Sequence, residues 1–63
     1  MTLDEFQKRL REACDLHIAN VTASGVVLAA TCNALAEEKG ELDDGACKAI
    51  ATAEIERMEK ALT

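Results

Sequence analysis

The sequence predicts an all-α protein: a helical hairpin with a long first helix at about residues 2–38 and a shorter second helix at about residues 44–62. Apolar residues recur every three to four positions along both segments, which is the period of an amphipathic helix. The chain has no proline to interrupt either helix. A short acidic stretch at about residues 39–43, which contains Gly40, separates the two patterns. We expect residues 1–63 to form a single domain.

The first helix has a well-marked start at Thr2. The threonine hydroxyl is placed to cap the helix, and Glu5 follows three residues later, at the spacing of a capping box. Leu3, Phe6 and Leu10 then repeat at helical spacing, with charged residues on the remaining faces. The start of the chain is therefore predicted to be an amphipathic helix.

The centre of the chain, from Ile18 to Ala36, contains no charged residue. A helix without charge around its circumference needs partners on more than one side. We expect it to be buried by other helices and not to span a membrane. The polar and small residues that argue against a membrane span are Asn20, Thr22, Ser24, Gly25, Thr31 and Asn33.

Gly25 leaves two arrangements open. Glycine inside a helix costs about 1 kcal/mol relative to alanine and can end a helix. Three short helices broken at Gly25 are therefore the alternative to one long helix. Val26 follows directly, without loop residues, which favours the single helix, kinked at Gly25. Gly25 would equally allow a second backbone to approach closely.

The boundary before the second helix is the clearest in the chain. Gly40 marks the end of the first helix, and Asp43 or Asp44 is the expected N-cap of the second. A connection this short predicts that the two helices are antiparallel. The expected inward face of the second helix comprises Cys47, Ile50, Ala53 with Glu54, Met58, and Ala61 with Leu62.

One copy of the chain can form only a small core, because it has twelve alanines and a single aromatic residue, Phe6. In a hairpin, the shorter helix cannot cover the apolar face at the start of the longer one. Either the chain folds back at Gly25 or another subunit covers this face. We expect a homodimer or higher homo-oligomer that forms an antiparallel bundle. Its predicted core consists of Val21, Gly25, Leu28, Cys32 and Leu35.

No residue pattern indicates catalysis, a cofactor or a metal site. Cys14 and His17 share one helical face, but no second pair accompanies them, whereas structural zinc needs four ligands. A thiol nucleophile would also need oxyanion donors, and none can be identified. We expect both residues to be core residues, and the protein to be neither an enzyme nor a carrier of a cofactor or metal.

The cysteines predict a reducing compartment. Their number is odd, and positions 14, 32 and 47 do not have the spacing of a disulfide framework. The first fifteen residues carry charges of both signs without the apolar stretch of a secretory signal. We therefore expect a cytoplasmic protein.

The charge distribution disfavours nucleic-acid binding. The net charge is −5, whereas affinity for nucleic acid comes mainly from neutralised phosphates. Lys8, Arg9 and Arg11 form a basic cluster, which Arg57 and Lys60 are expected to join, but acidic residues surround it. The length and hairpin layout resemble the Rop-type helical hairpins, which dimerise into four-helix bundles and bind RNA loops. The resemblance is architectural and implies a dimeric bundle.

Two surfaces are candidates for binding a protein partner. Phe6 and Leu10 form an apolar patch that either binds a partner or is consumed by the homodimer. The second surface is an acidic tip, which either docks on a basic partner or is a solvated turn with helix caps. Its carboxylates are Glu37, Glu38, Glu41, Asp43 and Asp44.

These features predict a small, non-enzymatic regulatory or inhibitory protein that binds an unidentified protein target through a helical face or the acidic tip. Small acidic helical proteins of this kind are common among accessory factors, including those of phages. The alternatives are a helical hairpin that binds RNA or DNA and a bundle that binds a metal or small ligand.

Overall fold

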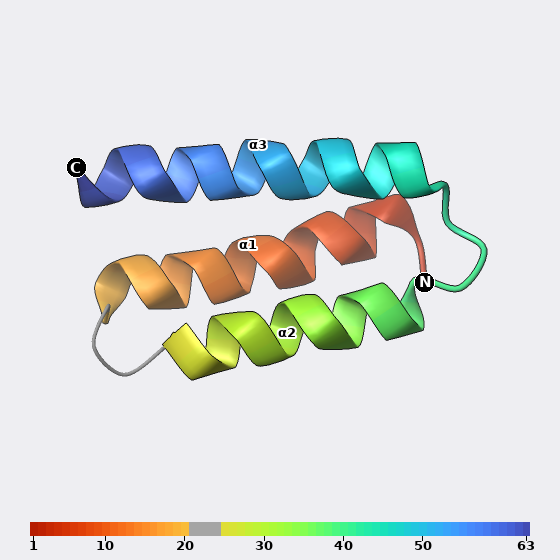
Figure 1. The fold of residues 1–63 in the computed structure, drawn as a ribbon, viewed down its shortest axis with the longest axis horizontal. Coiled ribbons are helices and arrows are strands. Elements are labelled where there is room, and N and C mark those ends of the chain that lie inside the picture. Colours follow the sequence, from red (N-terminus) through yellow and green to blue (C-terminus); the bar gives the residue numbers. More distant parts are fainter. Residues whose placement is uncertain (21–24) are drawn as a thin grey trace.

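The computed structural model describes residues 1–20 and 25–63, and within them the chain forms three helices: α1 (Leu3–Ala19), α2 (Gly25–Glu38) and α3 (Asp44–Leu62). The all-α class is confirmed. Helix α1 lies between the other two, α2 runs antiparallel to it, and α3 runs in the same direction as α1 (Figure 1). Both neighbours pack on α1, so α1 is the central element of the fold.

Helix α1 begins as the sequence predicts. The Thr2 hydroxyl accepts a hydrogen bond from the Glu5 backbone N–H at 3.1 Å, and the acidic residues of the first turn lie at the positive end of the helix dipole. The helix ends at Ala19. The C-cap is Asn20, whose backbone N–H donates to the Leu16 carbonyl at 3.0 Å.

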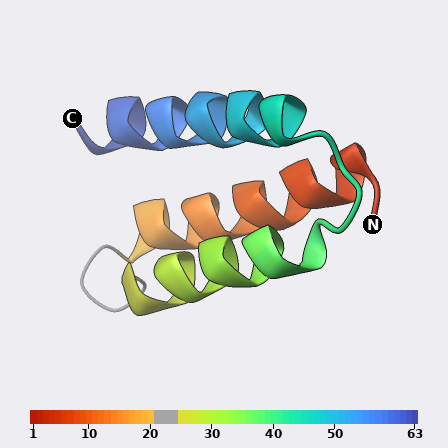
Figure 2. The same ribbon diagram turned by 45° about the vertical axis from the view of Figure 1, so that its right-hand side comes forward.

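The predicted continuous helix over residues 2–38 is wrong, and the three-helix alternative is the observed arrangement. Helix α2 starts at Gly25 and lies alongside α1 instead of extending it (Figures 1 and 2). The physical reason is burial: folding back brings Leu35 of α2 against Phe6 and Leu10 of α1, and all three become buried. A straight helix would leave Phe6 and Leu10 without a partner in the chain.

Gly25 is the first residue of α2, and close packing of a second backbone does not require a glycine there. A Cβ at Gly25 would meet no described atom nearer than Cε1 of His17, at 4.0 Å. This distance is an ordinary van der Waals contact.

The boundary between α2 and α3 has the predicted form. Gly40 has a φ of +58°, a left-handed conformation that side-chain-bearing residues avoid, and it follows the last turn of α2. Asp43 is the N-cap of α3, and its carboxylate accepts a hydrogen bond from the Ala46 backbone N–H at 2.8 Å.

One core joins the three helices. Its buried members are Phe6, Leu10 and Cys14 from α1, Leu35 from α2, and Cys47 and Met58 from α3. No Cα of α2 lies within 8 Å of a Cα of α3, so these two helices contact α1 but leave an open side between them. The body measures 33 × 19 × 13 Å along its principal axes. In the described part of the chain, no helix has the length and apolar character needed to cross a membrane.

Candidate functional site

A groove of about 260 Å³ lies between α2 and α3 on this open side. Phe6 of α1 lines it together with Cys32 and Ala36 of α2 and Cys47 and Ala51 of α3. A cavity of about 150 Å³ is large enough to hold benzene, so the groove has room for one large apolar side chain. Five of its eight lining residues are apolar.

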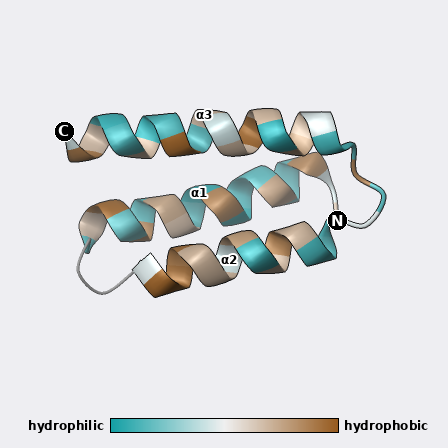
Figure 3. Cartoon of the chain, viewed as in Figure 1, coloured by the Kyte–Doolittle hydropathy of each residue, from teal (hydrophilic) through white to brown (hydrophobic). Residues whose placement is uncertain are grey.

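The groove follows from the small side chains on the inward edges of α2 and α3. Alanine and cysteine are too short to reach across the gap, and Phe6 is 6% exposed at the groove between them. Helix α2 is uncharged from Gly25 to Ala36, so the α2 wall of the groove carries no charge before Lys39. Figure 3 shows that most of α2 has the colours of apolar residues. The result is an apolar surface that the three helices of this chain do not fill.

Charged residues lie only at the end of the groove next to the connection between α2 and α3. Lys39 and Asp44 form an ion pair there, and Lys48 stands beside them. Cys32 and Cys47 are free thiols. The groove therefore has one polar end and an apolar interior, an arrangement typical of sites that orient an apolar group.

The uncovered patch predicted for Phe6 and Leu10 does not exist in the folded chain. Their exposed fractions are 6% and 1%, because α2 and α3 of the same chain cover them. The prediction depended on the long first helix, which would have kept this face away from residues 25–38. Only Phe6 retains a surface role, as part of the groove.

The residues predicted to form an oligomer core mostly belong to the core of the single chain. Leu35 is 1% exposed, and the half-buried Leu28 and Cys32 pack against the same cluster. Gly25 is exposed, and Val21 lies outside the described residues. Leu28, Cys32 and Leu35 form the inward face of α2, which packs on α1 of the same chain.

Most of the acidic tip is used within the chain. Glu38 forms an ion pair with Arg9 at 2.7 Å, Asp44 pairs with Lys39, and Asp43 caps α3. Glu37 and Glu41 are exposed. Three of the five carboxylates therefore form ion pairs or cap a helix within the chain. Among the contacts that the structure describes, Glu37 and Glu41 have no such role.

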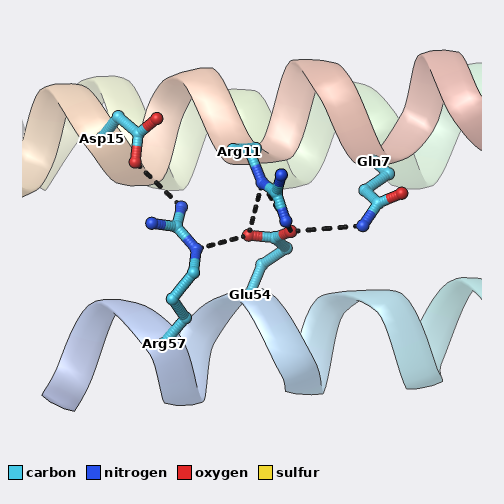
Figure 4. A network of polar contacts seen from close by, with 5 residues as sticks. All are labelled: Gln7, Arg11, Asp15, Glu54 and Arg57. Carbon is cyan, nitrogen blue, oxygen red and sulfur yellow. Dashed lines mark hydrogen bonds and ion pairs between the residues drawn. The ribbon is translucent and has the colours of Figure 1, made fainter.

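A polar cluster that the sequence did not predict joins α1 to α3 around Glu54 (Figure 4). The Glu54 side chain is 2% exposed and lies in the inward face of α3. Arg11 donates to it from Nε at 3.0 Å and Nη2 at 2.9 Å, Arg57 donates from Nε at 3.0 Å, and Gln7 donates at 3.4 Å. Arg57 also pairs with Asp15 at 2.8 Å.

The cluster keeps Glu54 ionised. The hydrogen bond from Arg11 lowers the pKa of Glu54, and the bonds from Arg57 and Gln7 act in the same direction, while burial opposes them. The hydrogen bond to Asp15 raises the pKa of Arg57, with a further contribution from Glu54. The sequence signal was the presence of a glutamate in an apolar face, which requires a partner once it is buried.

Cys14 lacks the environment of a nucleophile. It is fully buried, and burial raises the pKa of its thiol, as does the negative charge of Glu54. His17 is half-buried on the same helix. Among the residues that the structure describes, no group of three or more His, Cys, Asp or Glu side chains is arranged to hold a metal ion.

No protein-family model, no curated protein and no solved structure matches this chain. Its function must therefore be inferred from the geometry of its own residues.

Proposed function

We propose that this chain is a small, non-enzymatic regulatory or inhibitory protein that binds another protein by receiving one of its apolar helices in the groove between α2 and α3. The observation that carries this proposal is that both helices pack on α1 but not on each other. The unfilled groove over Phe6 results from this arrangement. A partner helix laid between α2 and α3 would complete a four-helix bundle.

The shape and chemistry of the groove favour a helix as the bound element. Recognition of a helix in a groove uses apolar anchor residues on one helical face. The groove accepts one large anchor above Phe6, and the small residues Ala36 and Ala51 allow the partner backbone to come close. Lys48 and the ion pair at the polar end would select the direction of the bound helix through its charges.

Two other features support protein binding over nucleic-acid binding. Arg11 and Arg57, expected to belong to a basic cluster, are bound to Glu54, and Arg9 is bound to Glu38. Phosphate groups would have to compete with these carboxylates, and the net charge of −5 repels them. The free thiols fit the proposed cytoplasmic location.

The proposal can be tested by filling the groove. Ala51→Trp places an indole over Phe6 and is expected to abolish co-purification of the partner from a lysate of the source cells. Ala53→Trp, on the exposed side of the same helix, is the matched control and should retain the partner. Circular dichroism establishes that both variants are folded. If Ala51→Trp does not fold, Ala36→Leu replaces it, because Ala36 lines the opposite wall.

The identity of the captured molecule separates the classes of function. A protein that is lost with Ala51→Trp and retained with Ala53→Trp supports the proposal. A partner retained equally by both variants would exclude the groove as the binding site. Nucleic acid that is released by nuclease or by high salt would show that the protein belongs to the alternative class.

A further inference from the structure

Two free thiols line the groove between α2 and α3. Cys32 lies on the α2 wall and Cys47 on the α3 wall. The third thiol, Cys14, lies in the core and does not line the groove. Helix binding alone does not require sulfur at these positions, because alanine would also give an apolar wall of small residues.

The two groove thiols cannot form a disulfide with each other in this fold. A disulfide needs Cα atoms within about 7 Å of each other. No Cα of α2 lies within 8 Å of a Cα of α3, so Cys32 and Cys47 are too far apart. A disulfide bond that joins either wall of the groove to the other side of the groove must therefore take its second sulfur from another molecule.

Cys32 is the most accessible of the three thiols. It is half-buried, whereas Cys47 is 5% exposed and Cys14 is fully buried. Burial also raises the pKa of the Cys14 thiol, which disfavours the reactive thiolate. Exchange with a disulfide requires both access to the sulfur and a thiolate. Cys32 is therefore expected to react before the other two cysteines.

We propose that Cys32 is a modification site, at which a small acidic disulfide of the class of glutathione disulfide transfers one half of its molecule to the protein. The Cys32 thiolate attacks one sulfur of the disulfide, and a new S–S bond forms as the old one breaks. Cys32 is oxidised, and the other half of the disulfide is reduced, leaves as a thiolate and takes up the proton that Cys32 lost. The attached half occupies the groove, whose volume of about 260 Å³ is close to that of the smallest ligand pockets.

The charges at the polar end of the groove favour an acidic group. Lys39 and Asp44 neutralise each other there, whereas Lys48 is exposed and belongs to none of the ion pairs between described residues. Cys32 is seven residues from Lys39 along α2, and Lys48 is four residues from Asp44 along α3. At 1.5 Å per residue, Lys48 and Cys32 differ by about one helical turn in height above this end. A group of tripeptide size that is attached to Cys32 can therefore bring a carboxylate to Lys48.

The modification would regulate partner binding, a consequence that rests on the proposed function. The group attached to Cys32 takes the space above Phe6 that the partner helix needs, so the conjugated chain is expected not to bind the partner. Excess dithiothreitol removes the group and should restore binding. The modification of Cys32 itself does not depend on the identity of the partner.

Mass spectrometry of the folded chain after incubation with glutathione disulfide tests the site. The expected product carries one glutathione, which peptide mapping places on Cys32. Cys32→Ser should abolish it, and Cys47→Ser, the matched control, should retain it. Circular dichroism establishes that the variants are folded, and Cys32→Ala replaces Cys32→Ser if the latter is not. No adduct, equal labelling of all three cysteines, preferential labelling of Cys47, or a disulfide between Cys14 and Cys32 would disprove the proposal.

The rate of the reaction tests the role of the groove. Ala51→Trp should protect Cys32, whereas Ala53→Trp, on the exposed side of α3, should not. Lys48→Gln should slow the reaction with glutathione disulfide by about two- to fivefold, the effect of one unit charge at contact distance in water. It should leave the reaction with bis(2-hydroxyethyl) disulfide, which is neutral, unchanged. Equal rates in Ala51→Trp and Ala53→Trp would show that Cys32 is reached from outside the groove.

Co-purification of the partner with the purified conjugate separates this inference from the proposed function. Loss of the partner on conjugation supports the regulation. If Ala51→Trp loses the partner and the conjugate retains it, the modification does not regulate the groove. If both retain the partner, the groove is not the binding site, and the proposed function fails while the adduct on Cys32 remains established by its mass.

Discussion

At the scale of single residues, Glu54 determines how α1 and α3 are joined. A buried carboxylate is unfavourable unless charged donors replace the water that it loses. Arg11 and Arg57 fill this role while their own side chains remain 52% and 39% exposed. Because the arginines can return to solvent and Glu54 cannot, the removal of both arginines is expected to be more damaging than neutralisation of Glu54.

The lowered pKa of Glu54 predicts how stability depends on pH. A carboxyl group with a lower pKa in the folded than in the unfolded state stabilises the fold above its unfolded pKa. This contribution is lost as the pH falls through the folded pKa. For Glu54, the loss begins below about pH 4.5, its ordinary pKa.

Glu54→Gln is therefore expected to lower the free energy of unfolding at pH 7 by about 1–3 kcal/mol, because the ion pairs with Arg11 and Arg57 are lost and the amide has one acceptor oxygen where the carboxylate has two. Below pH 4.5, the difference from the wild-type chain should shrink. Urea titrations at pH 7 and pH 3.5 measure both effects. Glu56→Gln, on the exposed side of α3, is the control. An equal difference at both pH values would contradict an ionised Glu54 in the folded state.

At the scale of the helices, some helix boundaries are determined by neighbouring residues and others are not. The caps at Thr2 and Asp43 and the turn at Gly40 depend on a few neighbouring residues, and all three occur as the sequence predicts. The break before Gly25 has no such cap among the described residues. It depends on burial of the α2 face against α1, which the local sequence does not contain.

The two glycines at helix boundaries are expected to respond in opposite ways to alanine. Gly40→Ala places a side chain at φ +58° and should cost about 1–2 kcal/mol. Gly25→Ala meets only His17 at 4.0 Å and should stabilise the protein by about 0.4–1 kcal/mol, since alanine restricts the unfolded chain. Thermal unfolding of both variants measures the two signs. A stabilising effect of Gly40→Ala would contradict the left-handed turn.

At the scale of the whole molecule, the open side between α2 and α3 is the main feature. Three helices around one core normally contact each other in all pairs, whereas here α2 and α3 share only α1. The groove over Phe6 is an apolar surface that the isolated chain leaves exposed to solvent. An exposed apolar surface lowers the stability of the isolated chain, and a binding function would explain why the chain has one.

Ala51→Leu should reveal this cost. The longer side chain is expected to reach over Phe6 and raise the free energy of unfolding by about 0.5–2 kcal/mol, the range of cavity-filling substitutions. Ala53→Leu, on the exposed side of α3, should change it by less than about 0.5 kcal/mol. Urea titration of both variants measures the difference. Destabilisation by Ala51→Leu would indicate that the groove has no room for an additional apolar group.

The sequence by itself determined the helical class, the start of α1 and the boundary around Gly40 and Asp43, because these depend on periodicity and on contacts between residues a few positions apart. It determined the inward face of α3 only in part. Cys47, Glu54 and Met58 are buried as predicted, whereas Ala53, Ala61 and Leu62, which were predicted on the same face, are exposed. It also placed Glu54 in an inward face but could not supply its partners, since Arg11 lies on another helix.

Only the tertiary structure decided that α2 lies alongside α1 and that Phe6 and Leu10 are covered by α2 and α3. It also decided that the groove between α2 and α3 is an unfilled apolar surface and that Leu16, Val26 and Val27 are exposed. The physical reason is that the uncharged stretch from Ile18 to Ala36 is compatible with both arrangements locally. The choice between them comes from burial of side chains far apart in the sequence.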